Sequence, residues 1–543
     1  MTALADRRVG FPGAELGARI AAAVRVHRRS LWWLLPLLAV AGTVSAINLG
    51  GAPQRIDDEG TYTAQAWAVS NLGTLAHYTF WYDHPPLGWI QMALYGQVTG
   101  AFARYSIAVV AMREAMVVAS LISVVLVWVL ARRLTLSRPA AAAAGLLFAV
   151  SPLALQFHRT VYLDNVATPW LLGALILALS RRNQLAAFTG SALMFGIAVL
   201  SKETYLLALP LLVFLAARSA APETRRYTLA VSGSVLALVT GSYLLLAAVK
   251  GELLPRSGQV SLLDGVTFQL ATRAASGSPF DPQSLTNRTL SRWWQLDAVF
   301  IVAALLASVA ALAVRRLRPY AVFTLAAVLF AFRPGGYIPV PYVIMLLPFG
   351  ALLVAAVVDG AARSLAARRR RVRAVGVLAV ALAAAVAVVP LWTTQLRGFL
   401  NANLDEPMSQ AQAWVGQNVP HQNRIIVDDA MWVDLVRQGR ERSDVIWYYK
   451  LDTDPAVARQ SPDGWRDSDY IVTTDSMRSF PDAFPQVQKA IDNSVVVASY
   501  GTGLRRVDVR QIQPAGLRAT AAAAEGAQRA AADAGTALAG NPR

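Results

Sequence analysis

The sequence of 543 residues contains no cysteine, which excludes disulfides, zinc–thiolate sites and iron–sulfur clusters. Charge is also scarce, at 15% of the residues, where a soluble protein carries about 25%. No Gly-rich phosphate loop is present, so we expect no nucleotide cofactor and no active site that uses ATP or a nucleotide sugar. Acidic residues are the scarcer kind, with 33 Asp and Glu against 50 Lys and Arg. These absences favour a membrane protein.

Long apolar runs take the place of the missing charge. The chain is 55% hydrophobic and its mean hydropathy is +0.42. At 1.5 Å per residue, most runs approach the length needed to cross a hydrocarbon core of ~30 Å. We therefore predict an all-α polytopic membrane domain over residues 31–399, with about eleven transmembrane helices. The runs lie at about 31–49, 112–131, 139–157, 166–180, 184–200, 203–217, 227–249, 298–314, 319–332, 340–362 and 374–393.

Short arginine clusters predict the orientation of these runs. The clusters occupy every second connection, beginning with the N-terminus, which is typical of cytoplasmic loops and not of a nucleic-acid surface. We expect residues 1–30 to be a basic cytoplasmic N-terminus, the first run to be an uncleaved anchor, and the C-terminus to be extracytoplasmic. The abundance of Ala and Arg favours a bacterial plasma membrane. The clusters are Arg28 and Arg29; Arg132, Arg133 and Arg138; Arg181 and Arg182; Arg218, Arg225 and Arg226; Arg315, Arg316 and Arg318; and residues 368–371.

Beyond the last run, residues 400–510 predict a small extracytoplasmic α/β domain. A helix at 410–419 precedes strand-like segments at 424–427 and 470–473, a helix near 485–491, and strands at 494–499 and 504–509. The paired carboxylates Asp428 and Asp429 follow the first strand, and we interpret them as solvated loop residues. The Ala-rich segment 511–543 is of low complexity and is predicted to be disordered.

Candidate chemistry lies in the predicted outer loop, residues 50–111. Asp57, Asp58 and Glu59 are adjacent carboxylates, which repel one another and are tolerated where they meet water, a cation or a proton. Residues 60–72 have helical spacing and end at a glycine, which predicts a helix along the membrane surface. A rigid turn, FWYDHPPLG, follows at residues 80–88. The alternative for this turn is an interfacial aromatic belt with incidental polar residues.

These motifs resemble those of the C-type (GT-C fold) glycosyltransferases that use polyprenyl-phosphate sugars. The run from Asp83 to Gly88 is similar to that of protein O-mannosyltransferases. The pair Asp58 and Glu59 is shared with them and with the aminoarabinose transferases that modify lipid A. The resemblance extends over about residues 31–393 and implies the GT-C fold for that part of the chain.

The resemblance also implies roles for individual residues. Asp58 is expected to be the catalytic carboxylate, and His84 to lie where a cation meets the lipid phosphate. In the aminoarabinose transferases that position is a lysine, preceded by a glutamate that binds a metal. Asp83 takes the place of the glutamate, so Asp83 and Asp58 are candidate ligands of a divalent metal ion, which is a possible cofactor.

Further candidates lie in other predicted outer turns. The resemblance implies that Asp164, preceded by Arg159, approaches the first-loop aspartate; a local ion pair between these two residues is the alternative. Lys202 stands between two apolar runs, where a charge is a functional candidate by default. A snorkelling lysine paired with Glu203 is the alternative.

Two later loops add aromatic and cationic residues. The turn RPGGY, from Arg333 to Tyr337, and the following Tyr342 resemble the late loop that closes over the lipid phosphate. In the loop at 250–297, Trp293 and its neighbours suit an interfacial belt, with stacking on a sugar face as the alternative.

We conclude that the sequence predicts an integral-membrane inverting glycosyltransferase, a hexosyl- or pentosyltransferase. A sugar would move from a polyprenyl-monophosphate donor to a cell-envelope glycan, lipid or protein on the extracytoplasmic side. The alternatives are an ion- or proton-coupled secondary transporter or lipid-sugar flippase, and a membrane-anchored scaffold that binds cell-wall polymer; no nucleic-acid partner is expected. The assigned residues are Asp58 and Asp164 for catalysis, His84, Lys202 and Arg333 for the donor phosphate, and Asp57, Glu59, Tyr82, Arg159, Tyr337, Tyr342 and Trp293 for support or substrate binding.

Overall fold

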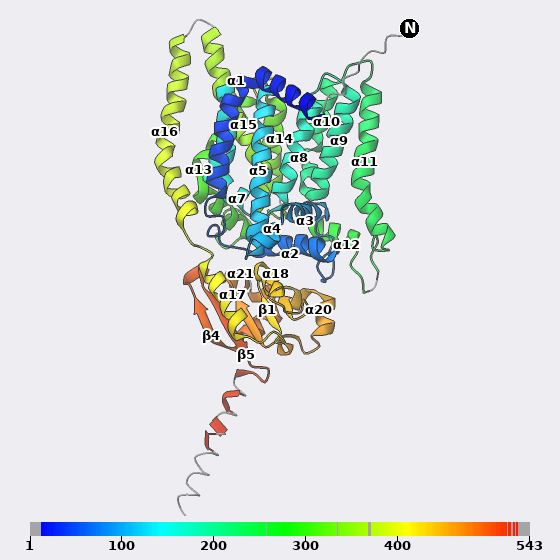
Figure 1. Ribbon diagram of the computed structural model, residues 1–543, viewed down its shortest axis with the longest axis vertical. Coiled ribbons are helices and arrows are strands. Elements are labelled where there is room, and N and C mark those ends of the chain that lie inside the picture. The colour runs from blue at the N-terminus through cyan, green and yellow to red at the C-terminus, as the bar shows by residue number, and fades with distance from the viewer. Residues whose placement is uncertain are drawn as a thin grey trace, which may run out of the picture.

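The computed structural model describes residues 12–529 except 257, 334, 368–370, 480, 518, 519, 523, 524 and 527. Long helices stand side by side in a bundle, and a small region with a β-sheet packs against one end of it (Figure 1). The bundle helices are α1 (Pro12–Ala46), α5 (Ala108–Arg133), α6 (Arg138–Val150), α7 (Pro152–Arg159), α8 (Leu163–Ala178), α9 (Gln184–Ser201), η1 (Glu203–Ala208), α10 (Leu209–Ser219), α11 (Arg225–Val249), α13 (Leu285–Ala311), α14 (Arg318–Ala331), η3 (Val340–Met345), α15 (Leu347–Ala367) and α16 (Arg371–Asn401).

The chain is a multi-pass membrane protein. In the described residues, 7 helices are long and apolar enough to cross a membrane, or 8 if the bent pair α6 and α7 forms one span. Helices of this kind satisfy their backbone hydrogen bonds internally, as a hydrocarbon environment demands. Each predicted apolar run overlaps a helix, but α8 and α14 have only 16 and 14 residues. The run at 203–217 divides into η1 and α10. The count of eleven spans therefore stays a prediction.

The two ends of the bundle differ in composition. At one end, arginines from four separate connections line a common cavity, although they are far apart in sequence. We call this the arginine end; its lining includes Arg133, Arg181, Arg182, Arg218 and Arg316. The other end, which we call the sheet end, faces the C-terminal region (Figure 1). The segregation matches the arginine pattern of the sequence, because alternate connections of a helical bundle meet at the same end.

Short helices lie across the sheet end, between the bundle and the C-terminal region (Figure 1). They are α2 (Asp57–Leu72), α3 (Leu87–Thr99), α4 (Ala101–Arg104), α12 (Leu262–Thr267) and η2 (Phe268–Thr272). The predicted surface helix is present as α2, and Gly73 closes it in the left-handed conformation with φ 67°. However, α2 begins earlier than the spacing indicated, so the three acidic residues form its first turn. Carboxylates are favourable there because of the helix dipole.

The C-terminal region contains a five-stranded sheet with strand order β2-β1-β3-β5-β4. Strand β1 (Ile425–Val427) is parallel to β2 (Val445–Trp447) and β3 (Tyr470–Thr473), whereas β5 (Val507–Ile512) is antiparallel to β3 and to β4 (Ser494–Tyr500). The sequence indicated every strand except β2. The helices are α17 (Glu406–Asn418), α18 (Asp429–Arg437), α19 (Lys450–Thr453), α20 (Pro455–Gln460), η4 (Gly464–Asp467), α21 (Asp475–Ser479), η5 (Pro481–Ala483), α22 (Pro485–Asp492) and η6 (Gly503–Arg505). Most of the predicted disordered segment, 511–543, lies outside the described residues.

Candidate functional site

A buried ion pair fixes the first turn of α2. Arg113 of α5 donates two hydrogen bonds to Glu59, at 2.8 and 2.5 Å, and both side chains are fully buried. Glu59 also accepts a hydrogen bond of 2.8 Å from the backbone N–H of Val161, just before α8. Glu59 therefore joins α2, α5 and the turn that carries the predicted residue Asp164. Because breaking one side of such a pair leaves a buried charge, this contact determines where the neighbouring carboxylates point.

Asp58 is the exposed member of the acidic trio, yet protein surrounds it closely. Burial by that surrounding protein is the largest cause that raises its pKa to about 6, followed by the adjacent charge of Asp57. Lys202, at the end of α9, opposes this rise most strongly among the positive side chains. A carboxyl with a pKa near neutrality can gain or lose a proton at working pH.

Lys202 is buried and lies within a ring of carboxylates. Burial alone would lower its pKa, but nearby acidic side chains raise it above the usual value. The acidic residues that act on it are, from the largest effect, Glu203, Asp164, Asp58 and Asp83. The structure therefore brings Lys202 together with Asp164, Asp58 and Asp83, which the sequence analysis took from three outer loops. Glu203 is a partner at 3.8 Å, so the predicted Lys–Glu pair exists, although it is long.

His84 makes contacts that fix the orientation of its ring. Its Nε2 lies 3.0 Å from Nζ of Lys202 and 3.2 Å from the hydroxyl of Tyr62, and its Nδ1 lies 3.0 Å from Glu203. An ammonium group only donates and a carboxylate only accepts, so these contacts assign the proton to Nδ1 and leave Nε2 as an acceptor. The lysine and histidine thus stand together, on the same side as Asp58.

The late loop contributes to this cluster in a way that the sequence did not indicate. Arg273 stacks on the ring of Tyr337, with its guanidinium carbon 3.4 Å from the ring centroid, and its charge acts on Asp58. By contrast, Arg333 lies just after α14 and stacks on Phe330 at the end of that helix, 4.3 Å from the ring centroid. The described contacts therefore place Arg273, and not Arg333, beside the carboxylate. No signal in the sequence indicated Arg273, because its loop has no regular pattern of residues.

The other predicted supporting residues make contacts within the fold. Arg159 is fully buried and donates to the carbonyls of Ile47 and Phe399, and no ion pair with Asp164 occurs in the described residues. Three more side chains hold neighbouring segments: Trp293 donates to Val340 O at 3.1 Å, Tyr342 donates to Ala327 O at 2.9 Å, and Tyr82 donates to Glu252. Trp293 is buried, so it does not form the interfacial belt that its sequence suggested, whereas Trp294 is exposed.

A seam between α2 and the C-terminal region holds further carboxylates. Asp428 and Asp429 are both 1% exposed, so the interpretation as solvated loop residues is wrong. They begin α18, whose N-terminus packs against α2. Asp429 accepts a hydrogen bond from Thr61, and Tyr448 donates one of 3.2 Å to Asp57. The burial of Asp429 could not be read from the sequence because its partner Thr61 lies 368 residues away.

Electrostatics couple this seam to the acidic trio. Burial is the largest cause that raises the pKa of Asp428 to about 6, and the charge of Asp57 is the next. Burial, then Asp428 and Asp57, raise the pKa of Asp429 well above its usual range. The charge of Asp57 therefore makes both carboxyls of the seam harder to ionise.

Close backbone contact and a buried ion pair fix the seam. A Cβ on Gly60 would lie 2.0 Å from the backbone nitrogen of Ala430, so only glycine allows α2 and α18 to approach this closely. Arg55, which is 2% exposed, donates to Asp405 at 2.8 Å and lies 3.6 Å from Asp434. The C-terminal region is therefore a fixed part of the structure around Asp58.

The donor set for a metal ion is small. In the described part of the chain, no group of three or more His, Asp or Glu side chains has the arrangement needed to hold a metal ion. Asp58 and Asp83 alone are two candidate ligands, fewer than the sites of divalent metals commonly use. Metal binding by Asp58 and Asp83 therefore stays a prediction, and no chemical step below depends on it.

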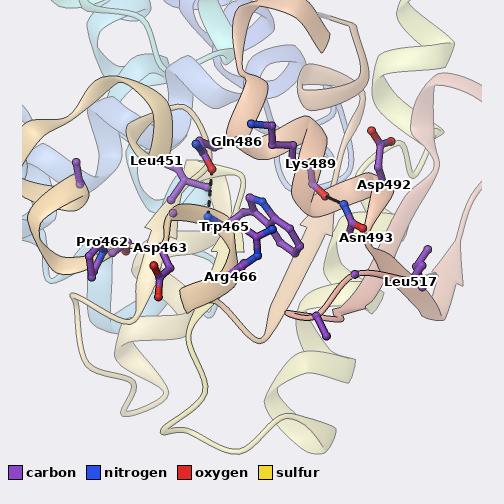
Figure 2. Close-up of a pocket in the computed structure, with 15 residues that line it drawn as sticks. Leu451, Pro462, Asp463, Trp465, Arg466, Gln486, Lys489, Asp492, Asn493 and Leu517 are labelled. Atoms are coloured by element: carbon purple, nitrogen blue, oxygen red, sulfur yellow. Dashed lines mark hydrogen bonds between the residues drawn. The ribbon is translucent and has the colours of Figure 1, made fainter. Parts of the chain in front are cut away.

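A second cavity of about 1070 Å³ lies in the C-terminal region (Figure 2). It is lined by segments of η4 and α22, and none of the predicted site residues contributes to it. Trp465 is only 3% exposed, and the guanidinium of Arg466 stacks on its ring at 4.8 Å. The indole face is therefore covered, and the cavity is separate from the Asp58 cluster.

Comparisons with known proteins agree with this fold. Residues 83–245, less than half of the chain, match the family model of dolichyl-phosphate-mannose-protein mannosyltransferase. No curated protein matches the sequence. Among solved structures, ArnT from Cupriavidus metallidurans bound to undecaprenyl phosphate is similar with a TM-score of 0.57 at 16% identity, covering 89% of this chain and 98% of that chain.

Two further structures support the same conclusion. The apo state of ArnT from Cupriavidus metallidurans has a TM-score of 0.58 at 17% identity, with 89% of this chain and 98% of that chain covered. An oligosaccharyltransferase from Archaeoglobus fulgidus has a TM-score of 0.51 at 13% identity, with 86% and 73% covered. The chain therefore has the GT-C fold of membrane glycosyltransferases, which confirms the resemblance read from its motifs.

Proposed function

We propose that this protein is an inverting glycosyltransferase that moves a hexose or pentose from a polyprenyl-monophosphate donor to a cell-envelope acceptor on the extracytoplasmic side. The observation that carries the proposal is the convergence of Asp58 with Lys202 and His84 at the sheet end. A base and a phosphate-binding pair side by side are what this reaction needs. The undecaprenyl phosphate bound to the similar ArnT supports a lipid donor of this class.

In the proposed reaction, the acceptor hydroxyl oxygen attacks C1 of the sugar while the bond from C1 to the phosphate oxygen breaks. Asp58 takes the hydroxyl proton, and the lipid phosphate leaves with the bonding electron pair. In this proposal Lys202, with the ring of His84 beside it, stabilises the negative charge that grows on that phosphate, and Arg273 adds a second positive group. One displacement inverts the configuration at C1. A phosphate needs little help from an acid to leave, so no second carboxylic acid is required.

The remaining predicted residues have subsidiary roles in this proposal. Asp164 and Asp83 lie within electrostatic reach of Lys202 and would orient the acceptor. Glu59 holds the first turn of α2 through Arg113. Tyr337 would hold Arg273 in position through the stacking contact between its ring and the guanidinium group. Arg333 could act on the phosphate only if it left Phe330, so we assign its predicted role to Arg273.

The test compares two activities of the purified full-length protein in proteoliposomes. Undecaprenyl-phosphate mannose and undecaprenyl-phosphate arabinose are supplied as donors, and the release of undecaprenyl phosphate is measured with added envelope extract as acceptor. We expect release to depend on donor and acceptor together. Ion-driven uptake of a sugar lipid without release would support the transporter alternative, in which the carboxylates bind an ion.

A further inference from the structure

The arginine end of the bundle carries a cavity that the proposed reaction does not use. Its volume is about 760 Å³, and it lies among the ends of α5, α8, α10 and α14 and is open to solvent. Arginines come from each of the connections that meet there, and no Asp or Glu is part of the lining. The five arginines are Arg133, Arg181, Arg182, Arg218 and Arg316.

The guanidinium groups of this cavity have no acidic partner. In the described part of the chain, none of the five forms a salt bridge with a carboxylate within 4.0 Å. Arg316 donates to the hydroxyl of Thr135, which is a neutral acceptor. At the same end, Arg363 does pair with Asp359 at 2.6 Å, so carboxylates are used there where a structural ion pair is needed. All five side chains are exposed, so water screens their mutual repulsion in part, and an anion bound among them would reduce it further.

The arginines of four connections converge on this one cavity. Positive-inside topology accounts for arginines at this end, but it does not require residues so far apart in sequence to line the same cavity. Tyr320 is also in the lining, but its hydroxyl is buried and does not meet solvent in the cavity.

We propose that this cavity binds the phosphate headgroup of an anionic phospholipid, with a diphosphatidylglycerol as the best fit. Guanidinium groups bind phosphate oxygens in pairs, so five of them match two phosphates better than one. Leu134, Leu179 and Leu215 supply apolar lining beside the arginines, which suits the start of acyl chains. Basic cavities between the ends of membrane helices bind such headgroups in other proteins. A free polyphosphate shares the phosphate chemistry but would not use the leucines.

The test is native mass spectrometry of the full-length protein in detergent with tetraoleoyl cardiolipin, dioleoylphosphatidylglycerol or dioleoylphosphatidylcholine. The double variant Arg181→Gln/Arg182→Gln removes two lining charges. The control Arg225→Gln/Arg226→Gln removes two exposed charges at the same end that do not line the cavity. We expect cardiolipin to bind the wild type and the control equally, and the lining variant about tenfold more weakly.

Three outcomes would overturn the proposal. The first is equal cardiolipin binding by the lining variant and the control, and the second is equal binding of phosphatidylcholine and cardiolipin by the wild type. The third is competition: inorganic pyrophosphate that displaces cardiolipin at equal phosphate concentration would mean a soluble anion site. The melting temperature of each variant without lipid verifies folding, and Arg218→Gln provides an independent single variant if the double variant is unstable.

Discussion

At the scale of single residues, the environment of Asp58 explains how one member of an acidic trio becomes the base. Glu59 is held in an ion pair with Arg113, and Asp57 accepts a hydrogen bond from Tyr448. Asp58 alone remains exposed and faces the positive side chain of Lys202. Adjacent residues of the same type therefore have three different roles, because their partners come from three different parts of the chain.

This arrangement predicts the pH dependence of transfer. Asp58 must be ionised to accept a proton, and its pKa is raised to about 6 by burial and then by Asp57. We expect kcat/KM to fall about tenfold per pH unit below about pH 6, because that parameter reports groups of the free enzyme. Asp57→Asn removes the neighbouring charge, so the acidic limb should move to lower pH. If the acidic side of the pH profile of kcat/KM stayed in place or moved to higher pH in this variant, the assignment of Asp58 as the base would be contradicted.

At the scale of secondary-structure elements, the contact between α2 and α18 connects the bundle to the C-terminal region. Both helices begin with carboxylates at the seam, where the positive ends of the helix dipoles make acidic residues favourable. The seam thus gathers acidic side chains beside Asp58, and the buried pair of Arg55 with Asp405 holds it together. A change that separates these helices should disturb both the docking and the reaction.

Gly60→Ala tests this contact. Its Cβ would meet the backbone of Ala430 at 2.0 Å, and backbone atoms of a packed helix cannot move away cheaply. We expect transfer to fall at least tenfold and limited proteolysis to cleave the C-terminal region faster. Gly241→Ala in α11 is the matched control, because a Cβ there meets nothing within 4 Å. Wild-type activity and an unchanged proteolysis pattern in the Gly60 variant would show that the close contact is not required.

Local patterns in the sequence predicted much of these elements and little of their contacts. The alternation of apolar runs and arginines indicated the bundle, and the acidic trio and the DHPP turn indicated Asp58 and His84, because each signal lies within a short segment. The burial of Asp429 depends on a partner that is hundreds of positions away, and the position of Arg273 depends on an irregular loop. Such long-range contacts do not produce a periodic pattern of residue types, so a single sequence does not predict them.

At the scale of the whole molecule, the proposal needs the two ends of the bundle to face opposite sides of the membrane. The absence of cysteine makes this testable, because a single introduced cysteine is the only thiol. Thr224→Cys lies beside the arginine clusters, and Gln422→Cys lies in the C-terminal region; both positions are exposed. We expect a membrane-impermeant maleimide to label only Gln422→Cys in intact cells, and both after permeabilisation. Labelling of Thr224→Cys in intact cells would mean that the arginine end faces outward, opposite to the predicted orientation.

The most direct test of the central claim is the release of undecaprenyl phosphate by Asp58→Asn in proteoliposomes, measured beside the wild type. Asparagine keeps the shape of the side chain, but its amide is not basic enough to take the proton from the acceptor hydroxyl. Loss of positioned base catalysis typically costs 10²–10⁴-fold, so we expect release to fall by about that factor, with binding of undecaprenyl phosphate retained through Lys202 and His84. Release at the wild-type rate by Asp58→Asn would contradict the account.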